Sequence, residues 1–327
     1  MAFRNWLYGK VRAISERYGY QEWEAPILEK LELYAAKSGE ELVKEQSFVL
    51  KDRGGDQLAL RPELTPSLAR MIAQRQATLV LPARWFSFGP FWRYERPQRG
   101  RAREFFQWNI DLLGLEDAVA DGEIVAIGAE FLRSVGLDAA QVGIFINSRR
   151  LMERKLEEIG IGDRQRLDVF RLIDRRDKLS TARWTVWAEE IGLSEDQVQG
   201  IESLLTNADL WQESEELCQV FATAEALGVA DYLTYEASIV RGLDYYTGPV
   251  FEAYDRKREF RAIFGGGRYD NLVADVGGDR ITGVGFAMGD MIIELLLNRA
   301  EVRPELPVSP SRVLVTLFND DLYAETL

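Results

Sequence analysis

The chain has 327 residues, a formal net charge of −13 at pH 7, one cysteine and no histidine. Because Cys218 is the single cysteine, a disulfide scaffold and a cysteine-rich zinc site are excluded, and a reducing, cytoplasmic compartment is predicted. The lack of histidine excludes histidine bases, histidine-containing triads and the usual imidazole metal ligands. The acidic balance argues mildly against a nucleic-acid partner. Since no apolar run approaches membrane-spanning length, no membrane partner is expected.

Residues 1–145 alternate between helical and antiparallel-strand patterns, beginning with an amphipathic helix over residues 1–20. Within these residues the most informative part is the stretch 86–114, where an apolar strand precedes five arginines within eleven residues and a second strand begins near Phe105. Pro97 to Gly100 have turn chemistry. We therefore predict two antiparallel strands joined by a loop whose guanidinium groups surround a polyphosphate. A solvated surface charge cluster is the weaker alternative.

Residues 146–232 have mainly helical periodicity, with glycines where helices would end, at Gly160, Gly192 and Gly228. This block predicts a helical insertion between two halves of one sheet. Strand patterns return over 233–299, and a closing helix is expected from about Met288 to Asn298. A linker rich in proline and polar residues follows over 300–311. Residues 312–327 predict a strand and the first turns of a helix, sixteen residues that cannot bury a core of their own.

The segment RGLDYYTGPVFE, Arg241 to Glu252, is predicted to be strand-like from Tyr245 onward. It combines a guanidinium, a carboxylate and two phenols with glycines that allow sharp turns. Such a set suits a pocket for a small, polar, partly aromatic ligand with an anionic end. On this segment alone, an amphipathic strand with a surface arginine is an equal alternative.

Five segments in chain order resemble the class II aminoacyl-tRNA synthetases, and among them the histidyl-tRNA synthetases. WRYERPQRGRAREFFQWNID resembles motif 2, and RGLDYYTGPVFE resembles the histidine-specific motif. The others are YGYQEWEAPILE (motif 1), LALRPELTPSLARM (the loop for the amino group) and FGGGRYDNLVADVGG with TGVGFAMGD (leading into motif 3). The resemblance implies an α+β fold with a mixed, mostly antiparallel sheet flanked by helices and carrying a helical insertion. It also implies a homodimer, and it identifies residues 312–327 as the truncated start of an anticodon-binding domain.

The implied activity is that of a histidine–tRNA ligase catalytic core. L-histidine and ATP, the latter accompanied by Mg²⁺, would form histidyl-adenylate and pyrophosphate, and histidine would then pass to tRNA(His). We expect no metal ligands among the protein side chains. A missing histidine base is no obstacle, because the substrate carboxylate is already ionised and needs mainly alignment and positive charge.

Site residues follow from the matching motif positions. The resemblance implies that Arg93 and Arg241 act at the reacting centre, on the α-phosphate and the substrate carboxylate. Glu95 would fix the adenine, Phe105 would stack on it, and Arg101 would reach the terminal phosphates.

The implied histidine site has two parts. The α-ammonium group would be bound by Glu63, Thr65 and Gln107. The imidazole nitrogens would be held by Asp111 and Tyr246, with Tyr245 and Tyr269 lining the same pocket.

Two positions depart from the family pattern: Ile292 stands where motif 3 has an arginine that grips the γ-phosphate, and Asp111 stands where glutamate is more common. Ile292 and the missing anticodon domain favour an alternative, a non-catalytic regulatory subunit of ATP phosphoribosyltransferase. A structural dimer with vestigial pockets is a third possibility. The intact RGLDYYTG segment and the arginine set of motif 2 favour the synthetase core over both.

Overall fold

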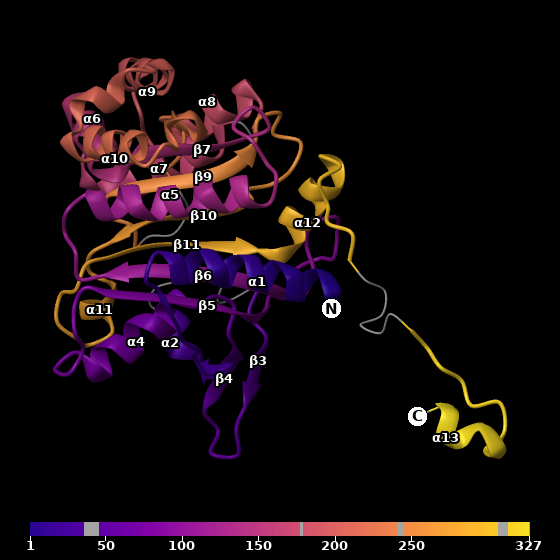
Figure 1. Cartoon of the computed structure of the whole chain (residues 1–327). Helices are drawn as coiled ribbons and strands as arrows, with labels where there is room; N and C mark the ends of the chain where they lie inside the picture. Colours follow the sequence, from indigo (N-terminus) through magenta and orange to yellow (C-terminus); the bar gives the residue numbers. More distant parts are fainter. Residues whose placement is uncertain (36–45, 177–178, 241–244, 307–312, 327) are drawn as a thin grey trace.

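The computed structural model describes residues 1–35, 46–176, 179–240, 245–306 and 313–326. Its main sheet has eight strands in the order β1-β5-β6-β11-β10-β9-β7-β8 (Figure 1). The outermost pairs, β1 with β5 and β7 with β8, are parallel, and the pairs between them are antiparallel. The expected mixed, mostly antiparallel sheet is thereby confirmed. The strands are β1 Gln21–Glu22, β5 Ala83–Trp92, β6 Glu104–Leu113, β7 Val142–Ser148, β8 Leu233–Tyr235, β9 Pro249–Asp255, β10 Phe264–Tyr269 and β11 Gly283–Gly289.

Two long helices, α1 (Ala2–Arg17) and α5 (Val119–Ser134), cover one face of this sheet (Figure 1). Trp108 of β6 lies in the core between them and the sheet, with its ring centroid 5.2 Å from that of Phe131 on α5. Helix α12 (Asp290–Arg299) follows β11 directly. Its first residue, Asp290, accepts hydrogen bonds from the Phe106 backbone N–H (3.1 Å) and from Arg4 Nε (2.7 Å). The start of α12 is thus fixed to both β6 and α1.

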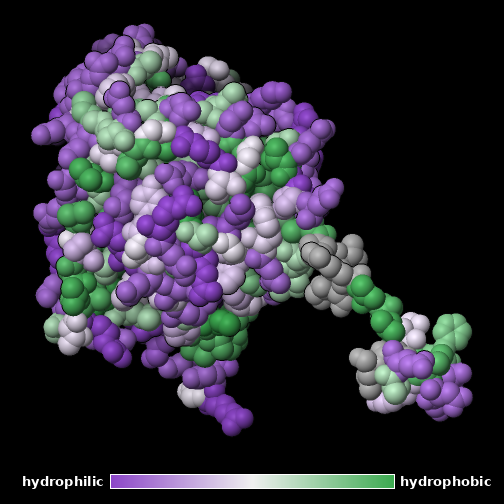
Figure 2. Space-filling model, in the orientation of Figure 1, coloured by the Kyte–Doolittle hydropathy of each residue, from purple (hydrophilic) through white to green (hydrophobic). Residues whose placement is uncertain are grey.

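A second, three-stranded sheet projects from the body in the order β2-β4-β3, formed by Leu28–Lys30, Gln57–Leu60 and Val49–Lys51. Helix α2 (Leu31–Ala35) packs against it, and α4 (Thr65–Arg75) contacts both α2 and the short α11 (Leu272–Asp275). Four apolar side chains in or next to this sheet are 40–44% exposed: Ile27, Leu28, Val49 and Leu50. Figure 2 shows apolar surface at the base of this projecting hairpin and a hydrophilic tip.

A block of helices lies between β7 and β8. It comprises α6 Arg149–Glu158, α7 Asp163–Asp174, α8 Thr181–Glu190, α9 Glu195–Thr206, η2 Leu210–Glu213, α10 Glu215–Ala226 and η3 Ala230–Tyr232. Serine side chains accept backbone hydrogen bonds at the starts of α6, α8, α9 and α10, as N-caps do. The glycines predicted at helix ends have φ of +81°, +82° and +69°, at Gly160, Gly192 and Gly228. These predicted helix ends are confirmed. Throughout the described ranges, each helix is too short or too polar to cross a membrane.

Two element boundaries and one predicted strand differ from the sequence predictions. Strand β9 begins at Pro249 rather than Tyr245, and just before it Thr247 donates its backbone N–H to the carbonyl of Arg268 on β10 (2.8 Å). Helix α12 begins at Asp290, since Met288 still pairs with Trp108 in the sheet. The strand expected after Arg312 is not formed, because residues 313–318 are exposed and have no strand partner among the described residues. Short helical turns, η4 (Asp320–Leu322) and α13 (Tyr323–Thr326), follow them.

Candidate active site

A cavity of about 300 Å³ lies on the face of the sheet opposite α5. Strand β6 contributes three of its polar side chains, because alternate residues of a strand share one face. They are Gln107, Asn109 and Asp111. The residues between them belong to the core: Trp108, Ile110 and Leu112. The apolar-polar alternation of β6 therefore separates the core from the cavity.

Asp111 lies at one end of the cavity, where it is 4% exposed. Tyr269 Oη donates a hydrogen bond to Asp111 Oδ1 at 2.6 Å. Burial raises the pKa of Asp111 to about 7, although the Tyr269 hydrogen bond lowers it. Gly285 on the neighbouring strand makes room for this carboxylate, because a β-carbon there would collide with it. Asp111 is therefore a buried hydrogen-bond acceptor that changes between its charged and neutral forms near neutral pH.

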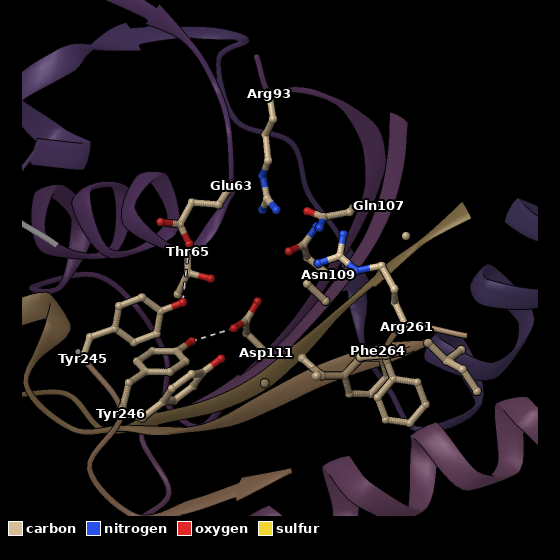
Figure 3. A pocket seen from close by; sticks show the side chains of 18 residues that line it. Glu63, Thr65, Arg93, Gln107, Asn109, Asp111, Tyr245, Tyr246, Arg261 and Phe264 are labelled. Carbon is tan, nitrogen blue, oxygen red and sulfur yellow. Dashed lines mark hydrogen bonds between the residues drawn. The ribbon is translucent and has the colours of Figure 1, made fainter. Parts of the chain in front are cut away.

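Four more side chains line this end of the cavity near Asp111 (Figure 3). Tyr245 Oη donates to Glu63 Oε2 at 3.4 Å, and Glu63 is 7% exposed. The ring centroids of Tyr245 and Tyr246 are 4.8 Å apart. Thr65, the first residue of α4, joins them in the lining. Hydroxyls and carboxylates at several angles suit a small ligand with several N–H groups.

Arg93 supplies positive charge to the cavity. Its guanidinium points inward between Glu63 and Gln107 (Figure 3). Arg93 Nε donates to the Pro62 carbonyl at 2.9 Å, and the guanidinium lies 5.3 Å from the centroid of the Phe105 ring. Burial lowers the pKa of Arg93, and the nearby Glu63 and Glu95 carboxylates raise it. These contacts hold the planar group in one orientation, as binding of an oxyanion requires.

Beyond Arg93, the hairpin between β5 and β6 lies beside the cavity and not in its lining. Arg101 and Glu95 form an ion pair within it at 2.9 Å. At its tip, Gly100 has φ of +79° and packs so closely on α12 that a β-carbon would lie 2.6 Å from Ile292 Cδ1. Ile292 is 9% exposed. The position of the motif 3 arginine is therefore occupied by an apolar contact between α12 and the hairpin.

The structure brings eight of the predicted site residues into the cavity: Glu63, Thr65, Arg93, Gln107, Asp111, Tyr245, Tyr246 and Tyr269. Glu95, Arg101 and Phe105 lie on the hairpin side of Arg93, outside the lining. Arg241 lies outside the described residues. Sequence reasoning missed two polar residues of the lining, Asn109 and Arg261. The alternation of β6 could have indicated Asn109, whereas Arg261 lies in a connection without a recognisable motif.

An antiparallel sheet backed by helices, with a polar cavity beside an arginine-rich hairpin, is the catalytic fold of the class II aminoacyl-tRNA synthetases. The solved structure of histidyl-tRNA synthetase from Nostoc sp. PCC 7120 has this fold. It superposes with a TM-score of 0.82 at 25% identity, over 98% of this chain and 78% of that one. The chain belongs to the histidyl-tRNA synthetase family, whose model matches residues 1–291.

Relatives agree with this assignment. The chain is 38% identical to the chloroplastic/mitochondrial histidine–tRNA ligase of Arabidopsis thaliana, over 98% of this chain and 68% of that protein. It is 39% identical to the histidine–tRNA ligase of Thermoplasma volcanium, over 93% and 73% respectively. A Bacillus halodurans structure described as an ATP phosphoribosyltransferase regulatory subunit/histidyl-tRNA synthetase has a TM-score of 0.76 at 23% identity, over 90% of this chain and 78% of that one. That likeness concerns the fold alone.

Proposed function

We propose that the chain is the catalytic core of a histidine–tRNA ligase, which activates L-histidine with ATP and transfers it to tRNA(His). The observation that carries the proposal is the polarity of one cavity. Asp111 and the phenols occupy one end, the guanidinium of Arg93 occupies the other, and the Glu63 carboxylate lies near both Tyr245 and Arg93. An amino acid with a hydrogen-bonding ring would fill the first end and present its carboxylate to the second.

In the first step, a carboxylate oxygen of histidine forms a bond to the α-phosphorus of ATP, while the bond from that phosphorus to the β-bridging oxygen breaks. Pyrophosphate leaves with its electron pair. The protein need not remove a proton, because the substrate carboxylate is already ionised. Arg93 would align the two anions and offset the charge that develops between them. Arg241 is proposed for the same centre.

In the second step, a ribose hydroxyl at the end of tRNA(His) attacks the carbonyl carbon of the adenylate, and AMP leaves. Histidine would be recognised by its ring, with one imidazole N–H donating to Asp111 and the other nitrogen facing Tyr246. Glu63, Thr65 and Gln107 would bind the α-ammonium group. A site of buried hydrogen-bonding groups discriminates strongly, because an analogue without the matching N–H leaves them unpaired.

On the nucleotide side, Phe105 and Glu95 are proposed to bind the adenine, and Arg101 the terminal phosphates. The Arg101–Glu95 ion pair would open when ATP arrives. Mg²⁺ would enter bound to the ATP phosphates. The two carboxylates of the described lining, Glu63 and Asp111, lie at the histidine end, so the ATP phosphates rather than these side chains would hold the ion.

A homodimer is proposed through the β2-β4-β3 sheet. Its exposed Ile27, Leu28, Val49 and Leu50 form the kind of apolar surface that marks an interface. Sedimentation velocity on the purified chain tests this assembly, and a monomer at micromolar concentration would contradict it. The cytoplasmic location stays a prediction from the single cysteine.

The test of the function is histidine-dependent exchange of pyrophosphate into ATP, with the other amino acids as controls. Exchange stimulated by histidine alone is the expected result. If histidine binds and exchange is absent, the regulatory-subunit alternative favoured by Ile292 replaces the synthetase.

Histidine binding should depend on pH through Asp111. Below pH 7 the empty site holds a protonated Asp111, so histidine affinity is expected to fall by about tenfold per pH unit. A triazole analogue of histidine, whose ring does not titrate in this range, removes the contribution of the substrate. In Tyr269→Phe the hydrogen bond that lowers the pKa of Asp111 is lost, so the midpoint should move to higher pH. Calorimetric titrations from pH 5.5 to 8.5 measure the affinity of the analogue for the unaltered chain and for Tyr269→Phe. An unchanged midpoint in Tyr269→Phe would contradict the assignment of the pH dependence to Asp111.

The packing of the hairpin tip on α12 can be tested with Gly100→Ala. The added methyl would push the tip away from Ile292, and we expect KM for ATP to rise by about tenfold or less with kcat largely retained. Gly19→Ala is the matched control, because Gly19 also has φ of +79° and a β-carbon there would meet nothing within 4 Å. Backbone strain is common to both variants, so equal kinetics in the two would show that the Ile292 contact does not position the hairpin.

A further inference from the structure

The cavity obtains no positive charge from α12 at the place where the family pattern has an arginine. Ile292 is buried there and packs under Gly100 of the hairpin. ATP nevertheless carries several negative charges into this end of the site. Positive charge from elsewhere in the chain would compensate for this absence.

Arg261 lies in the connection between β9 and β10, and it lines the same cavity. Other arginines of this connection point away and are engaged: Arg256 Nε donates to the Ala139 carbonyl at 3.0 Å, and Arg258 Nη2 donates to Glu236 at 2.6 Å. Within the described ranges, Arg261 forms neither a hydrogen bond nor an ion pair, and its side chain is exposed. Figure 3 shows its guanidinium directed toward the amides of Gln107 and Asn109.

Asn109 gives an independent indication of a ligand at this wall. It is 3% exposed, and its Nδ2 group has no hydrogen-bond partner among the described residues. A buried donor left unpaired costs free energy, so such a group in a cavity indicates a missing acceptor. Asn109 lines the cavity together with Arg261. A planar guanidinium and an amide N–H₂ group together supply donors alone toward a ligand oxygen, which suits a phosphate group.

We propose that Arg261 and Asn109 bind the phosphate groups of the nucleotide and of the leaving pyrophosphate, with Arg261 supplying the charge that Ile292 cannot. The inference rests on the proposed function, because it takes ATP as the nucleotide. The phosphate-binding charge would then come from the β9–β10 connection instead of the helix that follows β11. Both residues would touch the departing pyrophosphate, so they would act on kcat as well as on KM.

Equilibrium binding of ATP, inorganic pyrophosphate and adenosine to the full chain tests this assignment without requiring turnover. Arg261→Gln is expected to weaken ATP and pyrophosphate binding by about 10-fold to 100-fold, the loss of a charged hydrogen bond. Asn109→Ala should weaken the same two ligands by a smaller factor. Adenosine and histidine affinities should stay unchanged in both variants. Arg258→Gln is the matched control, since it removes a guanidinium of the same connection that points away from the cavity.

Unchanged ATP and pyrophosphate affinity in Arg261→Gln would overturn the inference, as would an equal loss for adenosine, which would place Arg261 on the nucleoside. Histidine-dependent exchange by the unaltered chain is measured in parallel. If that exchange occurs and Arg261→Gln matches it in kcat and in KM for ATP, this inference fails while the proposed function stands. If the unaltered chain neither binds ATP nor exchanges pyrophosphate, both fail.

Discussion

Asp111→Asn is expected to remove most histidine activation and, at pH 8, to make the folded chain more stable. The loss of activity follows from the loss of the charged acceptor for the imidazole N–H, and we expect kcat/KM for histidine to fall by about 100-fold or more. The KM for ATP should change little. An unchanged KM for histidine would remove Asp111 from the ring-binding site.

The gain in stability follows from the raised pKa of Asp111, about 7 against an ordinary value of 3.8. The protonated Asp111 carboxyl makes its full contribution to the free energy of unfolding at pH values below the pKa that the group has in the unfolded chain. This contribution is lost as the pH rises through the folded-state pKa of about 7. Above pH 7 the folded chain carries the full cost of a buried carboxylate, and asparagine does not carry it. With about 1.4 kcal/mol per pKa unit, and a discount for the amide's own hydrogen bonds, we expect a gain of about 1–3 kcal/mol at pH 8. Urea denaturation at pH 5 and pH 8 measures it, and the gain should shrink at pH 5.

Asp270→Asn is the matched control, because the pKa of Asp270 is shifted down whereas that of Asp111 is shifted up. Burial alone would raise the pKa of Asp270, but hydrogen bonds from Thr282 (2.6 Å) and Thr247 (2.8 Å) and the charge of Arg150 lower it. The ionised Asp270 carboxylate stabilises the folded chain at pH values above the pKa that the group has in the unfolded chain. This stabilisation is lost as the pH falls through the lower pKa of the folded chain. Asp270→Asn should therefore lose stability at pH 8. Losses in both variants would show that the burial of Asp111 carries no electrostatic cost.

Arg93→Ala is expected to lower the rate of pyrophosphate exchange by about 10²–10³-fold while leaving the chain folded. The basis is the loss of a fixed donor at the position where charge develops. Arg93→Lys should recover part of the rate, because it keeps the charge but not the planar fork. Arg17→Ala is the control, because Arg17 is an exposed residue of α1 outside the hairpin and the cavity lining, and it should exchange normally. Equal rates in Arg93→Ala and Arg17→Ala would exclude Arg93 from the reacting centre.

Local patterns predicted the parts of this structure that depend on neighbouring residues. The β5–β6 hairpin was predictable because two apolar strands flank turn chemistry, and the placing of Gln107 and Asp111 on one face follows from the two-residue period of a strand. Asn109 obeys the same period and could have been included. Arg261 could not, since its position depends on how the β9–β10 connection folds over the cavity. The contact of Ile292 with Gly100 joins segments nearly 200 residues apart, so no local pattern contains it.

Because core and cavity residues alternate along β6, mutations on this strand should have one of two effects, on folding or on activity. Substitutions at Trp108, Ile110 or Leu112 would act on the yield of folded protein, and substitutions at Gln107, Asn109 or Asp111 would act on what that protein does. Substitutions at the cavity-facing positions of β6 can therefore change substrate specificity without destabilising the fold. An insertion or deletion of a single residue there has no such freedom, because it exchanges the two faces and places the polar set in the core.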